Sequence, residues 1–489
     1  MAVVLDRTAE TAPPIALLGV HFDNVTTGET VGLIEQMVTS GRPHYLATAN
    51  VDFLVQALHD VELRRILMDA HLVLCDGTPL LWASRWLGNP LPERVAGSDL
   101  VPLLIKIAAK KKYRIFFLGG TPVATAKAVE NLQKEHPDLI ISGYYSPPFS
   151  KLLEMDHEEI SRRVREAKPD LMFVSFGCPK QEKWIAMHYR ALGVPVSVGV
   201  GATIDFLAGT ARRAPHWMRG IGCEWIFRML QEPKRLGPRY FADLWHFSQA
   251  IVHQWWRMRG RRARKARAEE VSQEPGTASQ QRIRMPRRLD VDTVRRHSMI
   301  CEQALSNSRH CLLELANVEF IDSTGMGLLI RLQKKARIAG GQLILLAPSR
   351  AVQSALRLMR LQDFFQVARD MAAAQKMVAH PAGGAVRQQP GYYSWRPSLS
   401  WRGEVTAANA DEVWQFTQDH LEQIHGGKQV LIDLTDLQFI DSTGLGVMIR
   451  AKKKALQKGL KVTFTGPQPN VRNVLKLANL EKFLLEKAT

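Results

Sequence analysis

Six short, almost continuous apolar runs alternate with helical patterns through the first half of this 489-residue chain. Strands that are apolar on both faces and separated by helices are typical of a parallel sheet covered on both sides. In such sheets, ligands bind beyond the carboxyl ends of the strands. We therefore expect an α/β, Rossmann-like first half with its site at that edge. The six runs are HYLATAN, HLVLCDG, YRIFFLGG, LIISGYY, LMFVSFG and VPVSVGVG.

The second half contains an internal repeat. Its first copy includes VEFIDSTGMGLLIRLQKKA and its second includes LQFIDSTGLGVMIRAKKKA, so Ser323 and Ser442 are equivalent. The two copies are farther apart than the roughly 20 to 50 residues of a solenoid unit. Each copy predicts a strand, a D-S-T-G box, a basic amphipathic helix and a further strand. We expect two small α/β domains in tandem.

Composition limits the partners and the compartment. The net charge of +18 points to an anionic partner, such as lipid headgroups, nucleic acid or a phosphorylated substrate. The five cysteines form no C-x-x-C pair, which favours reduced thiols over a disulfide framework or a zinc site. The sequence has neither a signal-peptide pattern nor an apolar stretch long enough to cross a bilayer. We expect a cytoplasmic protein that associates peripherally with the inner face of the cell membrane.

Basic residues crowd the end of the first half. A departing diphosphate is stabilised either by a metal on acidic ligands or by Arg, Lys and helix N-termini. The one Asp-x-Asp sequence, at 290–292, lies outside this half. The sequence therefore predicts a site without metal or cofactor. The basic residues are Arg212, Arg213, Arg219, Arg228, Lys234, Arg235 and Arg239.

Eight collinear blocks between Ile15 and Arg239 resemble the WecG/TagA/CpsF glycosyltransferases. The resemblance implies an inverting, metal-independent transfer of an N-acetylmannosamine-type sugar. The donor would be its UDP conjugate, and the acceptor N-acetylglucosamine on undecaprenyl diphosphate, in cell-surface polysaccharide synthesis. The blocks are TANVDFL, DAHLVLCDG, ERVAGSDL, FFLGGTP, PDLMFVSFGCPKQEKWI, GVGATIDFLAG, RRAPHWM and CEWIFRMLQEPKR.

The resemblance assigns roles to single residues. Asp76 matches the catalytic base that takes the proton from the acceptor hydroxyl; otherwise Asp76-Gly77 forms a turn after a strand. Thr48 and Asn50 match the lining of the nucleotide-sugar pocket, and their other reading is helix capping. For Gln181, Glu182 and three later arginines the alternative is exposure to solvent, and for Asp205 it is a helix cap. The further substrate-binding candidates are Arg94, Gln181, Glu182, Arg213, Arg228, Arg235 and Asp205.

Apolar and aromatic residues recur at helical spacing between Tyr240 and Trp256, and the cationic block RMRGRRARKAR follows at once. An aromatic amphipathic helix beside a basic cluster is typical of binding to anionic lipid. The alternatives are packing on the enzyme and an RNA-binding arm. No nucleic-acid fold accompanies the charge, so we expect a membrane surface and no nucleic acid as partner.

The two repeats resemble STAS domains of the SpoIIAA-like, anti-sigma factor antagonist type. The D-S-T-G box carries this resemblance, which implies phosphorylation of Ser323 and Ser442 by an anti-sigma-type serine kinase and control of another STAS partner. A serine at this position also caps the helix, whatever else it does. Phosphate at a helix N-terminus is favoured by the helix dipole.

The expected layout has three domains joined by polar segments. We expect two of these segments to be linkers, and we expect the first linker to keep the transferase half apart from the STAS half. The rival to a working enzyme is an inactive scaffold that acts in partner switching through its STAS domains. In chain order, the segments are 1–239 (glycosyltransferase), 240–267 (amphipathic and basic), 268–281 (linker), 282–380 (STAS, with D-S-T-G at 322–325), 381–390 (linker) and 391–489 (STAS, with D-S-T-G at 441–444).

Overall fold

A sheet of six parallel strands, in the order β4-β3-β8-β7-β5-β6, forms the centre of the first half. This confirms the predicted parallel sheet, and each of the six apolar runs supplies one strand. The bounds are β3 His44–Ala49, β4 Leu72–Cys75, β5 Arg114–Gly119, β6 Ile140–Tyr145, β7 Leu171–Ser175 and β8 Val196–Gly199.

This computed structural model describes residues 13–215, 218, 224–259, 272–277, 280–307, 310–339, 341–362, 364–379, 386–388, 398–424 and 429–485. Within these ranges, no helix combines the length and the apolar character needed to span a bilayer. The side chains of Arg228 and Arg235 lie outside the described part, as do residues 260–271 of the basic segment.

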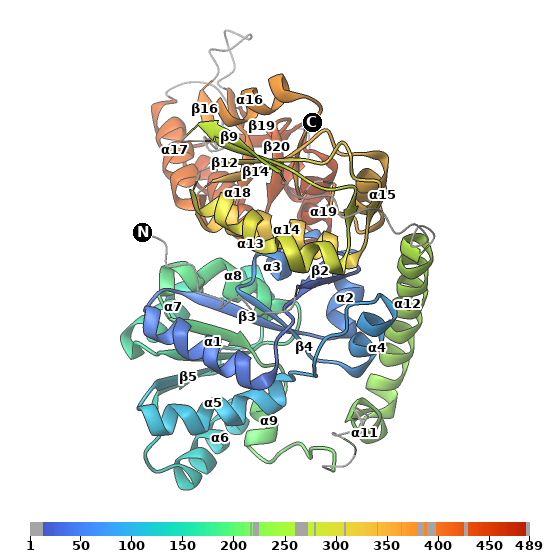
Figure 1. The fold of residues 1–489 in the computed structure, drawn as a ribbon. Coiled ribbons are helices and arrows are strands. Elements are labelled where there is room, and N and C mark those ends of the chain that lie inside the picture. Colours follow the sequence, from blue (N-terminus) through green and yellow to red (C-terminus); the bar gives the residue numbers. More distant parts are fainter. Residues whose placement is uncertain are drawn as a thin grey trace.

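Helices cover both faces of the sheet, as shown in Figure 1. Successive residues of a strand point to opposite faces, and β3 follows this rule: Tyr45 and Ala47 join one core cluster, whereas Leu46 joins the other. The first face carries α2 Val51–Ala57, α3 Val61–Asp69, α4 Thr78–Trp86, α7 His157–Ala167 and α8 Lys180–Leu192. The second carries α1 Thr27–Ser40, α5 Gly97–Lys111, α6 Pro122–Glu135 and α9 Thr203–Leu207.

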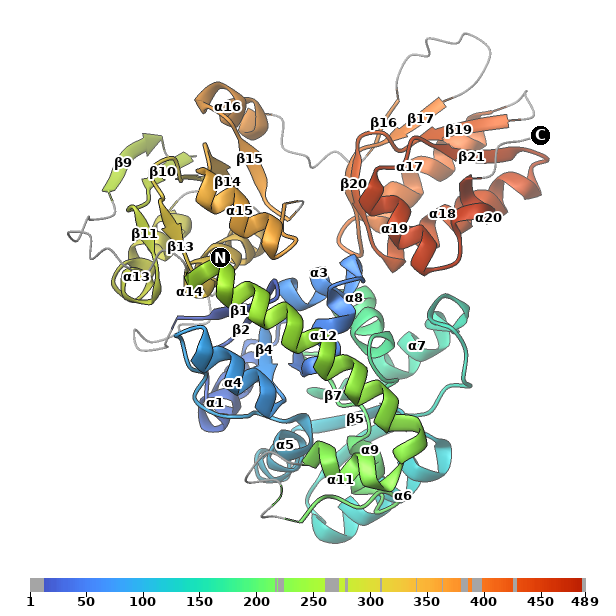
Figure 2. The same ribbon diagram turned by 90° about the vertical axis from the view of Figure 1, so that its right-hand side faces the viewer.

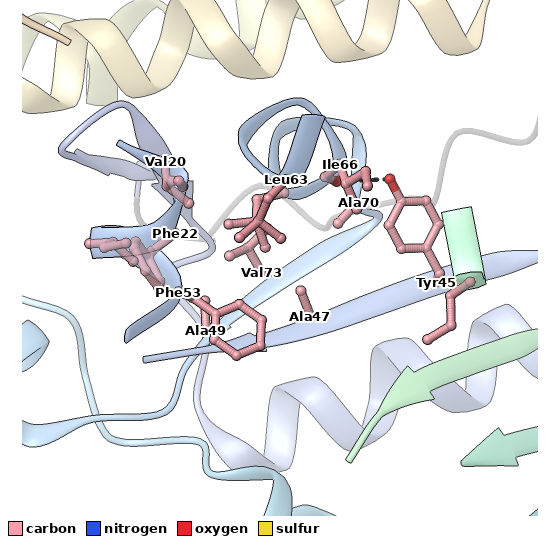
Figure 3. Packing of buried hydrophobic residues seen from close by; sticks show 14 of the residues in the cluster. Val20, Phe22, Tyr45, Ala47, Ala49, Phe53, Leu63, Ile66, Ala70 and Val73 are labelled. Atoms are coloured by element: carbon pink, nitrogen blue, oxygen red, sulfur yellow. Dashed lines mark hydrogen bonds between the residues drawn. The ribbon is translucent and has the colours of Figure 1, made fainter. Parts of the chain in front are cut away.

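Helix α3 packs its inner side on the sheet. Figure 3 shows Leu63, Ile66 and Ala70 above Tyr45 and Ala47 of β3, and the Tyr45 hydroxyl donates a 2.8 Å hydrogen bond to the carbonyl of Ile66. Beside this helix lies an antiparallel ribbon of β1 Ile15–Leu17 and β2 Val20–Phe22.

After α11 Glu224–Gln231, the chain forms the 27-residue helix α12 Pro233–Arg259. It runs along the outside of the first half toward the repeats (Figures 1 and 2). Phe247 and Ile251 are buried in the core cluster of the first face. The segment expected at 240–267 is therefore helical as far as 259 and packs on the enzyme by one side.

The first repeat, here called unit 1 (residues 272–379), has the sheet order β15-β14-β12-β10-β9, in which only β9 is antiparallel to its neighbour. A two-stranded sheet of β11 and β13 precedes the D-S-T-G box. The elements are β9 Ser272–Thr277, β10 Gln280–Arg284, β11 Arg288–Leu289, α13 Val291–Asn307, β12 His310–Glu314, β13 Phe320–Ile321, α14 Ser323–Ile338, β14 Gln342–Leu346, α15 Arg350–Leu358, β15 Gln366–Ala368 and α16 Met371–Ala379.

The second repeat, unit 2 (residues 386–485), has the order β16-β17-β19-β21, with β18 paired to β20. The match between the units confirms two tandem α/β domains. The elements are β16 Val386–Gln388, β17 Ser398–Trp401, β18 Gly403–Val405, α17 Ala410–Gln423, β19 Gln429–Asp433, β20 Leu437–Ile440, α18 Ser442–Gln457, β21 Lys461–Thr465, α19 Pro469–Leu477 and α20 Glu481–Leu485.

Two expectations about the linkers are wrong. The segment 268–281 contains β9 and the start of β10, and 381–390 contains β16, so both include strands that join the sheets of the units. The halves are also in contact. Both units lie against the α3 end of the first half (Figure 2), and the core cluster of unit 1 includes Ala16, Met68 and Met258 from before the linker.

Candidate active site

A pocket of about 420 Å³ opens at the carboxyl ends of β3, β4, β7 and β8. Its position confirms that polar residues after parallel strands come together at one edge of the sheet. Five of the expected site residues line it: Thr48, Asn50, Asp76, Arg94 and Gln181.

Asp76 directly follows β4 and faces this pocket. One carboxylate oxygen accepts a long hydrogen bond of 3.4 Å from the backbone N–H of Gly97. Withdrawal from water raises the pKa of Asp76 to about 6, while the nearby Arg94 guanidinium acts to lower it. A carboxylate with this pKa is ionised at neutral pH and is a stronger base than an exposed aspartate.

Three helices begin at the pocket without a side-chain cap. The N-cap residues of α4, α5 and α8 are Gly77, Ala96 and Pro179, whose side chains cannot accept a hydrogen bond. The first N–H groups of a helix are unsatisfied within it and carry a partial positive charge. Helices α4 and α8 follow the parallel strands β4 and β7, and α5 begins with the lining residues Gly97 and Ser98, so the three N-termini meet at the pocket. Helix N-termini suit an anion such as a diphosphate. The sequence signal was the absence of Ser, Thr, Asp or Asn at these caps.

Thr48 and Asn50 line the pocket and also have structural contacts. The Thr48 hydroxyl donates to the carbonyl of Gly199 at 3.4 Å, and Gly97 packs so closely that a Cβ there would lie 3.2 Å from the Thr48 oxygen. The Asn50 side chain accepts from the N–H of Phe53 at 3.3 Å and so caps α2. The capping alternative is therefore confirmed for Asn50.

Arg94 and Arg213 hold α11 against the start of α5. Arg94 forms ion pairs with Asp99 at 2.7 Å and with Glu224 of α11 at 3.3 Å, and Arg213 pairs with Asp99 at 2.6 Å. Arg213 lies behind the pocket and is not among its lining residues. The two carboxylates balance the charge of Arg94, so this cluster shapes the wall more than it adds positive charge.

Gln181 connects two loops that follow strands. Its side-chain oxygen accepts from the N–H groups of Gly177 and Gly201, both at 3.2 Å, and its nitrogen donates to Glu182 at 2.7 Å. Glu182 is 4% exposed and lies outside the lining, and burial raises its pKa to about 7. The pair is buried, contrary to the solvent-exposed alternative, and Glu182 has a structural position.

Asp205 lies on α9, between the lining residues Thr203 and Phe206, but does not itself line the pocket. Asp205 and Glu182, both expected to bind substrate, are thus not among the residues that line the pocket. Nothing about the side chains of Arg228 and Arg235 can be added, since they fall outside the described residues.

The sequence placed Arg235 and Arg239 of α12 among the basic residues near the site, but it did not predict that Tyr240 and Asp243 of this helix line the pocket. Arg239, Tyr240 and Asp243 line the pocket, and Arg239 forms ion pairs with Asp52 of α2 and, at 3.8 Å, with Asp243. The i,i+4 spacing of Arg239 and Asp243 was visible in the sequence. It was overlooked because the amphipathic pattern of this segment was interpreted as a membrane-binding helix.

The outer side of α12 is nevertheless apolar. Phe241, Trp245 and Trp256 are 75%, 57% and 71% exposed, and Val252 is also exposed. On α4, whose first residues share the pocket with α12, Trp82 and Trp86 are exposed as well. Large apolar side chains gathered on a surface mark an interaction site.

An α/β fold with uncapped helix N-termini and a carboxylate of raised pKa around one pocket is the arrangement of an enzyme active site. The model of the Glycosyl transferase WecG/TagA/CpsF family matches residues 15–261, and that of the STAS domain matches 266–374 and 396–488. The chain belongs to the WecG/TagA/CpsF family of glycosyltransferases, and units 1 and 2 are STAS domains.

The transferase assignment agrees with relatives of known name. N-acetylglucosaminyldiphosphoundecaprenol N-acetyl-beta-D-mannosaminyltransferases of Staphylococcus aureus strains MW2 and NCTC 8325 are 31% identical over 225 residues, covering 46% of this chain and 87% of theirs. Among solved structures, unphosphorylated anti-sigma factor antagonist SpoIIAA matches at 22% identity with a TM-score of 0.21, covering 22% of this chain and 96% of SpoIIAA. The phosphorylated Bacillus SpoIIAA matches at 21% identity with a TM-score of 0.20, over 22% of this chain and 99% of its own.

Proposed function

We propose that the first half transfers an N-acetylmannosamine-type sugar from a UDP-sugar to N-acetylglucosamine on undecaprenyl diphosphate, with inversion and without a metal. The observation that carries the proposal is Asp76, a carboxylate with a pKa raised to about 6, in a pocket where uncapped helix N-termini converge. The name of the Staphylococcus aureus relatives gives the transferred N-acetylmannosaminyl group and the N-acetylglucosaminyldiphosphoundecaprenol acceptor, and it supports these two choices.

In this mechanism, Asp76 removes the proton from the acceptor hydroxyl as its oxygen attacks the anomeric carbon of the donor. The bond from that carbon to the UDP oxygen breaks on the opposite face, so the configuration inverts. The N-termini of α4 and α5 stabilise the negative charge that develops on the diphosphate. Arg239 lines the pocket from α12 with its charge balanced by Asp52 and Asp243, so we assign the binding of the diphosphate on this side to Arg228 and Arg235.

The lipid-linked acceptor requires the enzyme to work at a membrane surface. We propose that the apolar side of α12 and the basic residues that follow it bind the anionic inner face of the cell membrane. The exposed residues Phe241, Trp245 and Trp256 support this assignment. The helix then has two roles, because its other side lines the pocket.

For units 1 and 2, we propose phosphorylation of Ser323 and Ser442 by an anti-sigma-type serine kinase. In this step a new bond forms between serine Oγ and the γ-phosphorus of ATP, and the γ-phosphorus loses its bond to the bridging oxygen. ADP departs, and a base of the kinase takes the hydroxyl proton. The helix caps are Asp322 and Asp441 and not the serines, contrary to expectation; each serine is the first residue of a long helix, where a phosphate is favoured by the dipole.

The decisive experiment is an assay of the purified chain with UDP-N-acetylmannosamine and a short-chain lipid diphosphate bearing N-acetylglucosamine, in excess EDTA. We expect product of inverted configuration. Asp76→Asn should lose most of this activity. Its matched control is Asp170→Asn, which changes an aspartate at the opposite end of the sheet, where Asp170 accepts a hydrogen bond from the N–H of Arg114. No product from the wild-type chain, with UDP binding absent, would favour the inactive scaffold.

A further inference from the structure

The outer side of helix α3 is buried although the helix lies at the edge of the first half. Glu62, Arg64 and Arg65 are only 2%, 6% and 9% exposed. Charged residues are rarely buried unless they are paired, so this face is built as an interface. Figure 3 shows α3 between the sheet below it and further helices above it, and α14 of unit 1 and α19 of unit 2 both contact it.

Unit 1 contacts the transferase through its D-S-T-G serine. The Ser323 hydroxyl is 1% exposed and accepts a 3.0 Å hydrogen bond from the side-chain nitrogen of Gln254 on α12. The same amide donates to Ala16 and accepts from the N–H of Leu18 at 2.9 Å, which ties α12, β1 and unit 1 together. A Cβ on Gly327 would lie 2.5 Å from the carbonyl oxygen of Pro14, so this contact requires glycine.

Unit 2 contacts the transferase through the same box but with a different group. The backbone N–H of Ser442 donates to the Glu62 carboxylate at 2.5 Å. The other oxygen of Glu62 pairs with Lys183 at 2.8 Å, and Lys183 also pairs with Asp60 at 2.7 Å. Glu62 thus occupies the N-terminus of α18, the position that a phosphate on Ser442 would favour.

Charges from all three domains meet beside these contacts. Arg65 and Asp69 come from α3, Arg337 from unit 1 and Glu404 from unit 2. Arg337 pairs with Asp69 at 3.0 Å and with Glu404 at 2.8 Å, and Arg65 pairs with Glu404 at 2.8 Å. Neither unit can leave without breaking this network, so the two are docked on α3 together.

We propose that the transferase is the partner of its own STAS domains, and that negative charge on Ser323 or Ser442 releases them from α3 and α12. The trigger rests on the phosphorylation proposed above, whereas the docking surface rests on the contacts alone. A separate protein that binds the D-S-T-G face would have to compete with the transferase for it.

Physical reasons for release differ between the two sites. A phosphate on Ser442 would enter a site that already holds the carboxylates of Glu62 and Asp441, which outnumber the single ammonium of Lys183. A phosphate on Ser323 would be buried against the neutral groups Gln254 and Met258. Burying a charge without a partner is strongly unfavourable. Because both serines are buried, a kinase reaches them only in the open form, and modification traps that form.

Release of the units would affect the active site because helix α12 contacts unit 1 and also lines the pocket. Gln254 contacts Ser323, and residues 236, 239, 240, 243 and 244 of the same α12 line the pocket. Helix α3 likewise follows α2, which begins at the pocket with Asn50. We therefore expect opening of the units to loosen this wall of the pocket and to lower the rate of transfer.

The test is amide hydrogen exchange on the full-length chain, comparing wild type with Ser323→Asp and Ser442→Asp. The control is Ser349→Asp, which adds the same charge at the N-cap of α15 within unit 1. We expect faster exchange in α3 and in the first turn of α14 or α18 for the two test variants, and no change for the control. Exchange in the central strand β7 should stay as in the wild type. Exchange in α3 equal to that of the control, or loss of protection in β7 together with α3, would overturn the proposal.

A double-mutant cycle isolates the Glu62 contact. Glu62→Gln keeps an oxygen that can accept from the Ser442 N–H but removes the like charge. In this background, Ser442→Asp should cause a smaller increase in exchange than it does alone, whereas Ser323→Asp should keep its full effect. Strictly additive effects of Glu62→Gln and Ser442→Asp would show that the two positions are not coupled and would contradict the proposal. No sugar substrate is used, so this test is independent of the transfer assay.

Discussion

Asp76 in the transferase and Asp441 in unit 2 both follow a parallel strand, and burial raises both pKa values, to about 6 and about 7. Their hydrogen bonds differ. Asp76 accepts one bond of 3.4 Å and faces an open pocket, whereas Asp441 accepts from Gly444 and Ala407, both at 2.9 Å. A buried acid with satisfied oxygens caps a helix, and one that is left nearly unsatisfied beside a cavity is available for proton transfer.

The largest expected difference between the two aspartates is in turnover. Asp76→Asn keeps the shape but removes the proton acceptor, so turnover should fall by about 10²–10⁴-fold, with UDP binding retained by calorimetry. Asp441→Asn should change turnover by less than about tenfold, because an asparagine oxygen can still accept both bonds. Equal losses in the two variants would remove Asp76 from the catalytic role.

The second difference concerns the free energy of unfolding. Because the folded state raises the pKa of Asp76, ionisation of this group destabilises the fold at every pH above about 6. Asp76→Asn should therefore stabilise the chain at pH 7 by about 3 kcal/mol, and the gain should vanish as the pH falls below 4. Denaturant titration at both pH values measures it. If Asp76→Asn were no more stable than the wild type at pH 7, burial would not destabilise the ionised form of Asp76.

The third difference is the pH dependence of transfer. Since the ionised form of Asp76 acts as the base, kcat/KM should rise about tenfold per pH unit below 6 and level off above it. Asp441→Asn should leave this profile in place. A wild-type profile that is flat between pH 5 and 7 would argue against Asp76 as the base.

The smallest effect is expected at the docked interface. Burial and the neighbouring Glu62 raise the pKa of Asp441, although hydrogen bonds from backbone N–H groups act to lower it, so the docked state favours the protonated form. Docking should therefore weaken as the pH rises through 7, by up to about tenfold per unit. Hydrogen exchange in α3 at pH 6 and 8, corrected for intrinsic rates, measures this, and Asp441→Asn should remove the dependence.

The sheet and the position of the pocket could be predicted because both follow from local patterns. Near-continuous apolar runs separated by helices specify a parallel sheet, and the connection of strands to helices then places Thr48, Asn50 and Asp76 at one edge. The roles of Gln181 and Glu182 could not be predicted in this way. Gln181 accepts hydrogen bonds from the backbone of Gly177 and Gly201 and donates one to Glu182, and a motif does not distinguish a polar pair that binds substrate from one that braces the loops.

The docking of the units was missed for a different reason. An amphipathic period in α12 predicts one apolar side, and it fits a lipid surface and a protein core equally well. In the structure, Phe247 and Ile251 are buried against the core and Trp245 is exposed. Packing on the enzyme is therefore observed for one side of the helix, and binding of lipid by the other side stays a prediction. The contact between Gln254 and Ser323 joins residues 69 positions apart, and no pattern within either segment indicates it.

Ala16, Met68 and Met258 lie before the first STAS domain in the chain but are buried with its core residues. Truncation of the chain before the first STAS domain would therefore not restore a transferase with a polar surface. A gene that lost its STAS domains would leave these three apolar side chains facing water, and the solubility of the shortened enzyme would decline until polar residues replaced them. Enzymes of this family that never carried a STAS domain are expected to have polar residues at the three corresponding positions, and an exchange of those residues would be the first step in adding or removing the regulatory half.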